Sequence, residues 1–166
     1  MHRWAAIFLL VAGTACATAR PSVAEIAVED LDGRRSTLAS LRGHAALLYL
    51  FTTSCDVCLA DMTKLRALDD RYRGSGVRIV GVALDPDGAR IVRPFAENLA
   101  LPFPIVVAGA ELRRGASSLG PIAAVPRVIV VDATGRVQED LSGVVTFDRL
   151  AAALERARAA GPRRER

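Results

Sequence analysis

The chain has 166 residues, of which 51% are hydrophobic, and it carries a formal net charge of +4. This length suits one domain with its own core and leaves no room for a second large one. The apolar content excludes a disordered chain. The stretch "ERARAAGPRRER" (155–166) is rich in arginine, but no aromatic residues alternate with these arginines, so we expect no nucleic-acid binding.

The first nineteen residues (1–19) have the pattern of an export signal. A charged start, "MHRW", precedes the apolar run "AAIFLLVAG", and "ATA" at 17–19 is a small-residue cleavage pattern. The run is too short to span a bilayer comfortably. Cys16 follows "GTA", which loosely resembles a lipoprotein box, so a signal that ends before Cys16 and an uncleaved anchor are the alternatives. We therefore expect an exported protein in the bacterial periplasm or on the outer face of the membrane, either soluble or anchored only through this end.

The first predicted elements after the signal are a hairpin, a buried strand and a helix. Residues 24–43 favour two short strands around an Asp32-Gly33 turn. The run "AALLYLF" (45–51) is apolar on both faces, which indicates a strand in a sheet that is covered on both sides. Residues 56–73 then take a helical period. The apolar positions expected on one face of that helix are Val57, Met62, Leu65, Leu68 and Tyr72.

The second half predicts further strands and helices in alternation. They are a buried strand at 77–84, a turn at 85–88, a helix at 89–100 that Pro94 should kink or delay, a short strand at 103–107, a weak helix at 110–120, strands at 126–132 and 136–143, and a final helix capped by Thr146. This order predicts an α/β fold with a central mixed β-sheet flanked by helices on both faces. We place one domain at 20–160, followed by an Arg-rich tail at 161–166.

Two cysteines stand where the first buried strand gives way to a helix, in "FTTSCDVC" (51–58). Free N–H groups and a partial positive charge at a helix N-terminus stabilise a thiolate, which lowers the pKa of a thiol such as that of Cys55. The spacing returns Cys58 beneath Cys55 after about one turn. The pair therefore suits a two-step exchange in which Cys55 attacks and Cys58 resolves the mixed disulfide.

Two other uses of the pair compete with redox chemistry. A zinc site needs about four ligands, but no second cysteine pair exists and the only histidines are His2 and His44, so we expect no metal. A purely structural disulfide is the stronger alternative, although such a short loop constrains the unfolded chain little. Export favours oxidation, and removal of the signal after Ala19 leaves Cys55 and Cys58 as an even pair.

Pro126 supplies a second feature, because it stands directly before the strand "RVIVVD". A cis Val125-Pro126 bond would be uncommon and usually functional; the simpler interpretation is a proline that opens a strand. Together with "CDVCLADMTKL" and "GPIAAVPRVIVVDATGRV", these residues resemble the exported TlpA/ResA-type thiol–disulfide oxidoreductases of the redoxin / AhpC-TSA superfamily. The resemblance covers about residues 24–158.

The resemblance implies a thioredoxin-like fold with an N-terminal β-hairpin and a mid-domain insertion at 85–107. It implies that Pro126 is cis and faces the cysteines, and that Val125 binds the substrate backbone. It also implies cysteine-containing protein substrates, apocytochrome c among them, and a membrane thiol protein as electron donor. The redox-active disulfide Cys55–Cys58 would then be the only redox group, with no further cofactor.

The chain departs from the family at several positions around the pair. Ser54 replaces the usual tryptophan, Val57 replaces proline, and Asp61 stands where an active-site glutamate would be. Asp61 is one turn beyond Cys58 and is either a proton acceptor for the pair or a solvated helix carboxylate. Asp56 places negative charge beside Cys55, which opposes the thiolate and predicts a comparatively reducing couple.

Three other functions remain open at this stage. A copper-delivery protein of the Sco type shares the fold, but its cysteines are four apart and it needs a later histidine, which this chain lacks after His44. A peroxiredoxin-like antioxidant would use Thr52, three residues before Cys55, together with Arg127. A non-catalytic thioredoxin-like scaffold is the last alternative, because the usual Trp and Pro around the pair are missing.

Overall fold

A seven-stranded mixed sheet forms the centre of the protein in the computed structural model, which describes residues 20–161. The strand order is β2-β1-β5-β4-β3-β6-β7. The strands are β1 (Ala27–Asp30), β2 (Arg35–Thr37), β3 (Ala45–Phe51), β4 (Val77–Ala83), β5 (Ile105–Ala108), β6 (Arg127–Val131) and β7 (Val137–Ser142). Central β3 pairs parallel with β4 and antiparallel with β6, so the sheet is mixed, as the sequence predicts.

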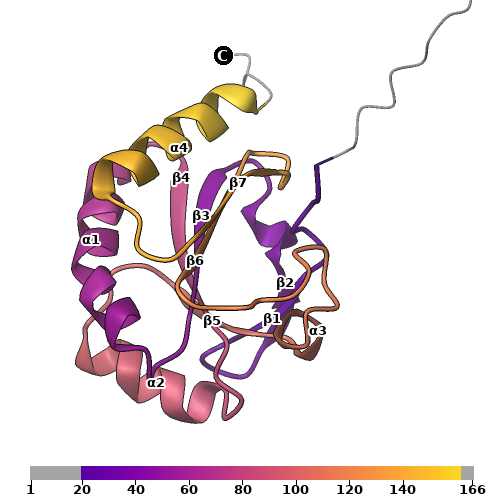
Figure 1. Ribbon diagram of the computed structural model, residues 1–166, viewed down its shortest axis with the longest axis vertical. Helices are drawn as coiled ribbons and strands as arrows, with labels where there is room; N and C mark the ends of the chain where they lie inside the picture. The colour runs from indigo at the N-terminus through magenta and orange to yellow at the C-terminus, as the bar shows by residue number, and fades with distance from the viewer. Residues whose placement is uncertain (1–19, 162–166) are drawn as a thin grey trace, which may run out of the picture.

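Helices cover both faces of this sheet, but unequally (Figure 1). One face packs against the long helices α1 (Asp56–Tyr72), α2 (Ala89–Asn98) and α4 (Phe147–Ala160). The other face is covered by the short helices η1 (Leu38–Leu41) and α3 (Ala110–Arg113) and by neighbouring loops. The expected two-sided arrangement is confirmed.

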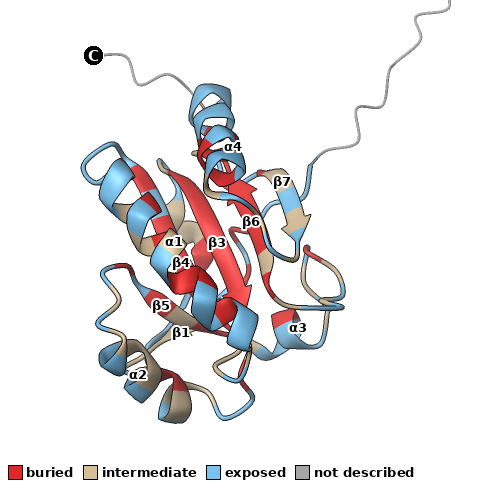
Figure 2. Cartoon of the chain, turned by 60° about the vertical axis from the view of Figure 1, so that its left-hand side comes forward, coloured by how far each residue is buried: buried red, intermediate tan, exposed pale blue. Residues whose placement is uncertain are grey.

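Strand β3 is buried along its whole length, as Figure 2 shows in red. Its odd-numbered side chains, Leu47, Tyr49 and Phe51, join the core beneath the long helices. Leu48 and Leu50 join the core on the opposite face. Because successive side chains of a strand point to opposite faces, a run that is apolar at every position fits only a strand covered on both sides.

The predicted insertion at 85–107 contains α2 and most of β5. β5 lies between β1 and β4, so the insertion joins the N-terminal hairpin to the centre of the sheet. Two details of the sequence analysis are wrong. The first is the late start of the helix, which was one of two expected effects of Pro94, because α2 begins at Ala89. The second is the placement of Val57 on the buried face of α1, because its side chain is 48% exposed. The buried face begins instead at Cys58, which is four residues before Met62 and therefore on the same side of the helix.

The predicted export signal, Cys16 and residues 162–166 of the tail lie outside the described residues. Within residues 20–161, no helix combines the length and apolar character that crossing a bilayer requires.

The turn between β6 and β7 is organised by a buried carboxylate, Asp132. It accepts hydrogen bonds from the backbone N–H and hydroxyl of Thr134, from the N–H of Arg136 and from the side chain of Gln138. Burial by itself raises the pKa of Asp132, but these hydrogen bonds outweigh it and hold the pKa below its usual value. The ionised form of Asp132 is therefore more stable in the folded protein than in the unfolded chain.

Replacing Asp132 by Asn should lower the free energy of unfolding by about 1–3 kcal/mol near neutral pH. A depressed folded pKa contributes stability that is present above the unfolded value of about 3.9 and is lost as the pH falls through the folded value. The difference in the free energy of unfolding between wild type and Asp132→Asn should therefore become smaller below about pH 4. Urea unfolding across this range measures it, and a difference that stays constant down to about pH 2 would contradict the assignment.

Candidate active site

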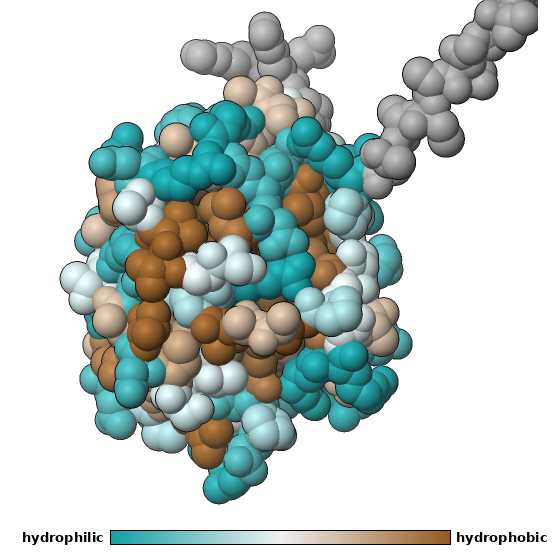
Figure 3. Space-filling view, in the orientation of Figure 1, coloured by the Kyte–Doolittle hydropathy of each residue, from teal (hydrophilic) through white to brown (hydrophobic). Residues whose placement is uncertain are grey.

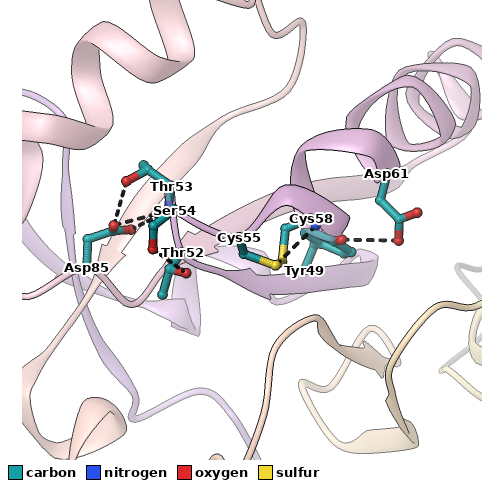
Figure 4. The surroundings of a disulfide bond; sticks show 8 residues. All are labelled: Tyr49, Thr52, Thr53, Ser54, Cys55, Cys58, Asp61 and Asp85. Atoms are coloured by element: carbon teal, nitrogen blue, oxygen red, sulfur yellow. Dashed lines mark hydrogen bonds between the residues drawn. A yellow bond between two sulfur atoms is a disulfide. The ribbon is translucent and has the colours of Figure 1, made fainter.

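The two cysteines lie at the junction of β3 and α1 and are joined by a disulfide, with a Cα–Cα separation of 5.2 Å (Figure 4). The chain leaves β3 at Phe51 and makes a turn in which the Cys55 N–H donates to the Thr52 carbonyl. Cys55 is the N-cap residue of α1, and its Sγ accepts the N–H of Cys58 at 3.1 Å. A sulfur in this position receives the free N–H groups of the first turn, which favours its thiolate in the reduced protein.

The two cysteines differ in their access to solvent. Cys58 is completely buried, at 0% exposure, whereas Cys55 is half-buried. Only Cys55 can therefore meet the sulfur of a second molecule without a rearrangement of α1. This asymmetry matches the order predicted from the spacing, in which Cys55 attacks and Cys58 resolves.

The Val125-Pro126 bond is cis, as the resemblance implies. Pro126 is buried and directly precedes β6, and Arg127 pairs with Leu50 near the end of β3. The start of β6 and the end of β3 therefore meet at one edge of the sheet. This register brings Val125 and Pro126 to the edge from which the Cys55 turn leaves.

Asp61 is buried rather than solvated, so that alternative of the sequence analysis is wrong. Its carboxylate accepts a hydrogen bond from the Tyr49 hydroxyl at 3.1 Å and pairs with Lys64 Nζ at 2.8 Å. Lys64, the only lysine of the chain, also donates to the Val145 carbonyl in the loop before α4. Burial raises the pKa of Tyr49, and the charge and hydrogen bond of Asp61 add to that effect, so the phenol stays protonated as a donor.

A second buried carboxylate, Asp85, lies on the opposite side of the disulfide from Asp61 (Figure 4). It follows β4, and both of its oxygens accept the Thr53 N–H, at 3.0 and 3.1 Å. Oδ1 also accepts the Thr53 hydroxyl, at 2.7 Å. The sequence analysis placed Asp85 only in a turn, and it gave no role to Tyr49 or Lys64. Tyr49 is the one polar side chain in an otherwise apolar strand, and that was the available signal for it.

The two predicted redox-tuning residues flank Cys55 and are exposed. Asp56 is the first residue of α1 and the only acidic residue in its first turn. The Ser54 hydroxyl lies 3.5 Å from that of Thr52. In this structure the Thr52 hydroxyl therefore faces Ser54, and Asp56 is the residue directly after the N-cap cysteine.

Arg127, the arginine of the peroxidase alternative, is bound to other groups. The Arg127 guanidinium pairs with Asp140 at 2.6 Å and donates to the carbonyls of Leu119 and Pro121. Within residues 20–161, no three side chains of His, Cys, Asp or Glu group as a metal site.

Comparison with known proteins gives a consistent family. Residues 16–154 match the Redoxin family model. The chain belongs to the Redoxin family. The thiol-disulfide oxidoreductase ResA of Bacillus cereus is 31% identical over 130 residues, which are 78% of this chain and 72% of that protein. ResA of Geobacillus thermodenitrificans is 28% identical over 131 residues, 79% of this chain and 73% of that protein.

Solved structures agree with the fold. A thioredoxin-family thiol:disulfide interchange protein from Chlorobium tepidum superposes with a TM-score of 0.70 at 24% identity, covering 85% of this chain and 97% of that one. A secreted disulfide oxidoreductase of Mycobacterium tuberculosis gives a TM-score of 0.63 at 20% identity, covering 78% and 94%. The thioredoxin-like fold and the resemblance to ResA-type thiol–disulfide oxidoreductases are thus confirmed, and the reaction class is that of a protein-disulfide oxidoreductase.

Replacing Lys64 by Met should leave the buried Asp61 carboxylate without its cation and lower the free energy of unfolding by about 1–3 kcal/mol. Adding Asp61→Asn to that variant should recover part of the loss, because a neutral amide needs no cation. Urea unfolding of the single and double variants measures both effects.

The exposed pair Arg90–Asp87 has the same spacing in the chain and serves as the control. Arg90→Met should cost less than about 1 kcal/mol. A further loss on adding Asp61→Asn to Lys64→Met would contradict the assigned ion pair.

Proposed function

We propose that this protein is an exported reductase of protein disulfides that uses the Cys55–Cys58 dithiol. The observation that carries the proposal is the asymmetry of the pair, with an accessible sulfur at a helix N-terminus and a buried partner one turn away. The export pattern of residues 1–19 supports a location outside the cytosol, in the periplasm or at the outer face of the membrane.

The reaction follows from this arrangement. The Cys55 thiolate attacks one sulfur of a substrate disulfide, forming a mixed disulfide while the other substrate sulfur leaves as a thiolate. The Cys58 thiolate then attacks Cys55 Sγ, forming the intramolecular disulfide and releasing the second substrate sulfur. Two electrons pass from the protein to the substrate, whose two sulfurs take up the protons. No cofactor beyond the cysteine pair takes part, and a membrane dithiol protein restores the reduced form.

A protein substrate is supported by exposed apolar residues on α1 and in the loop before α4. The exposed large hydrophobic residues among 20–161 are Val57, Leu59 and Val144. Val57 and Leu59 flank Cys58 on α1, and the loop of Val144 is held by a hydrogen bond from the Gly143 N–H to the Pro126 carbonyl. Figure 3 shows a strip of apolar surface beside α1 and smaller apolar patches elsewhere on the same face, with hydrophilic residues between and around them. Such a surface suits an apolar polypeptide segment around the substrate cysteine, with Val125 and Pro126 beside its backbone.

Asp61 and Asp56 then have separate parts in the exchange. Asp61 is a proton acceptor for Cys58, which lies about one helical turn before it in α1. Tyr49 and Lys64 hold the Asp61 carboxylate in place. Asp56 opposes the Cys55 thiolate and makes the couple more reducing.

The asymmetry of the pair predicts opposite results for two serine variants. Cys58→Ser should accumulate a mixed disulfide with a protein substrate, because Cys55 still attacks and nothing resolves the product. Cys55→Ser should accumulate none, because Cys58 is buried. Mass spectrometry of denatured mixtures after alkylation measures the adduct. Equal adducts on both variants would overturn the assigned order.

The reduction potential tests the direction of electron flow. The protein beginning at Arg20 is equilibrated with defined thiol buffers and scored by mass after alkylation, because the only tryptophan, Trp4, lies in the signal. We expect a value near that of thioredoxin, about −270 mV, and a higher value for Asp56→Asn. A wild-type value near about −120 mV would identify an oxidant instead and would contradict both the direction and the effect of Asp56.

A further inference from the structure

The turn that carries Cys55 is anchored to the neighbouring strand at successive points. The Phe51 carbonyl, at the end of β3, accepts the Leu84 N–H at 2.8 Å, which continues the β3–β4 pairing one residue past the end of β4. Thr53 is then bound by Asp85, and the Cys55 N–H closes the turn on the Thr52 carbonyl. The position of the Cys55 sulfur is therefore fixed from β4 as well as from its own helix.

Asp85 is an unusual group for this role, because it is a carboxyl side chain that is only 3% exposed. Among residues 20–161, no arginine, lysine or histidine forms an ion pair with Asp85. Within the same range, the hydrogen bonds to its carboxylate all come from Thr53. A buried carboxylate without a cation is costly unless its hydrogen bonds are well formed. These bonds converge on a residue two positions before the attacking cysteine.

We infer that Asp85 is a positioning residue that sets the redox equilibrium of the Cys55–Cys58 pair through Thr53. It cannot touch a substrate, because it is buried, but it holds the turn in which Cys55 Sγ lies within bonding distance of Cys58. A fixed turn raises the effective concentration of one thiol at the other and so favours the disulfide. Releasing the turn should make the disulfide easier to reduce. This inference deepens the proposed function and rests on the pair being redox-active.

The reduction potential separates this role from a merely structural one. The potential reports the free-energy difference between the oxidised and the reduced folded protein, so a contact that serves both forms equally cancels. Global stability, in contrast, falls whenever a buried hydrogen-bonded carboxylate is lost. A positioning residue changes the potential, and a structural residue changes only the stability.

The chain contains a matched control in Asp132. It is also a buried carboxylate that accepts both the N–H and the hydroxyl of a nearby threonine, Thr134. It follows β6, whose other end pairs with the end of β3, so it lies at the opposite edge of the sheet from Cys55. Asp132→Asn removes the same chemistry far from the disulfide.

The test equilibrates the purified protein with reduced and oxidised glutathione and scores it by mass after alkylation. Asp85→Asn should shift the equilibrium constant at least about tenfold toward the dithiol, which corresponds to a potential about 30 mV higher. Asp132→Asn should stay within about twofold of wild type despite a comparable fall in Tm. Unchanged equilibria in Asp85→Asn, or an equal shift in Asp132→Asn, would overturn the inference.

A second pair of variants decides the matter if Asp85→Asn does not fold. Thr53→Val removes only the hydroxyl bond to Asp85 and should shift the equilibrium in the same direction by a smaller factor, whereas Thr53→Ser keeps the hydroxyl and should restore the wild-type value. Equal values for the two Thr53 variants would count against the inference. The wild-type potential tests the proposed reductase, whereas the differences between variants test Asp85, so the two can fail separately.

Discussion

The burial of β3 on both faces is the constraint on which the active site depends. A strand that is covered on both sides has no freedom to slide, because a shift by one residue would exchange the side chains of the two cores. Its pairing with β4 and β6 therefore fixes where the chain leaves the sheet. Cys55 follows four residues after that point, at the start of α1. The reactive sulfur is thus placed by the core rather than by a flexible loop.

Two buried carboxylates frame the disulfide, and they differ in how they are satisfied. Asp61 pairs with Lys64 and accepts a hydrogen bond from the Tyr49 hydroxyl. Asp85 has only neutral donors, all from Thr53. Both carboxylates lie near the same pair of cysteines, and burying a carboxylate costs free energy. Stability alone does not require such groups in a sheet that has a complete apolar core, which is the reason for assigning them to the chemistry.

Much of the fold could be predicted because it follows from local patterns. The apolar run at 45–51 and the helical period at 56–73 placed β3 and α1 correctly, since such periods are set by residues a few positions apart. Val57 was wrongly assigned to the buried face of α1. In the first turn of the helix, one position separates the exposed Val57 from the buried Cys58, so a helical period counted from Val57 begins on the wrong side. Pro94 was expected to kink or delay α2, but α2 begins at Ala89, and Val92 and Phe95 pack into the core on either side of Pro94.

The positions of the two cysteines follow from the sequence, because a pair three residues apart at a strand–helix junction lies about one helical turn apart. The tertiary structure alone decided what surrounds them. Thr53 and Asp85 are 32 residues apart, and Lys64 and Val145 are 81 apart. Contacts at such separations exist only after parallel pairing of β3 with β4 and the packing of α4 have aligned the segments. A pattern of neighbouring residues in the sequence therefore cannot predict hydrogen-bond partners that only the folded sheet brings together.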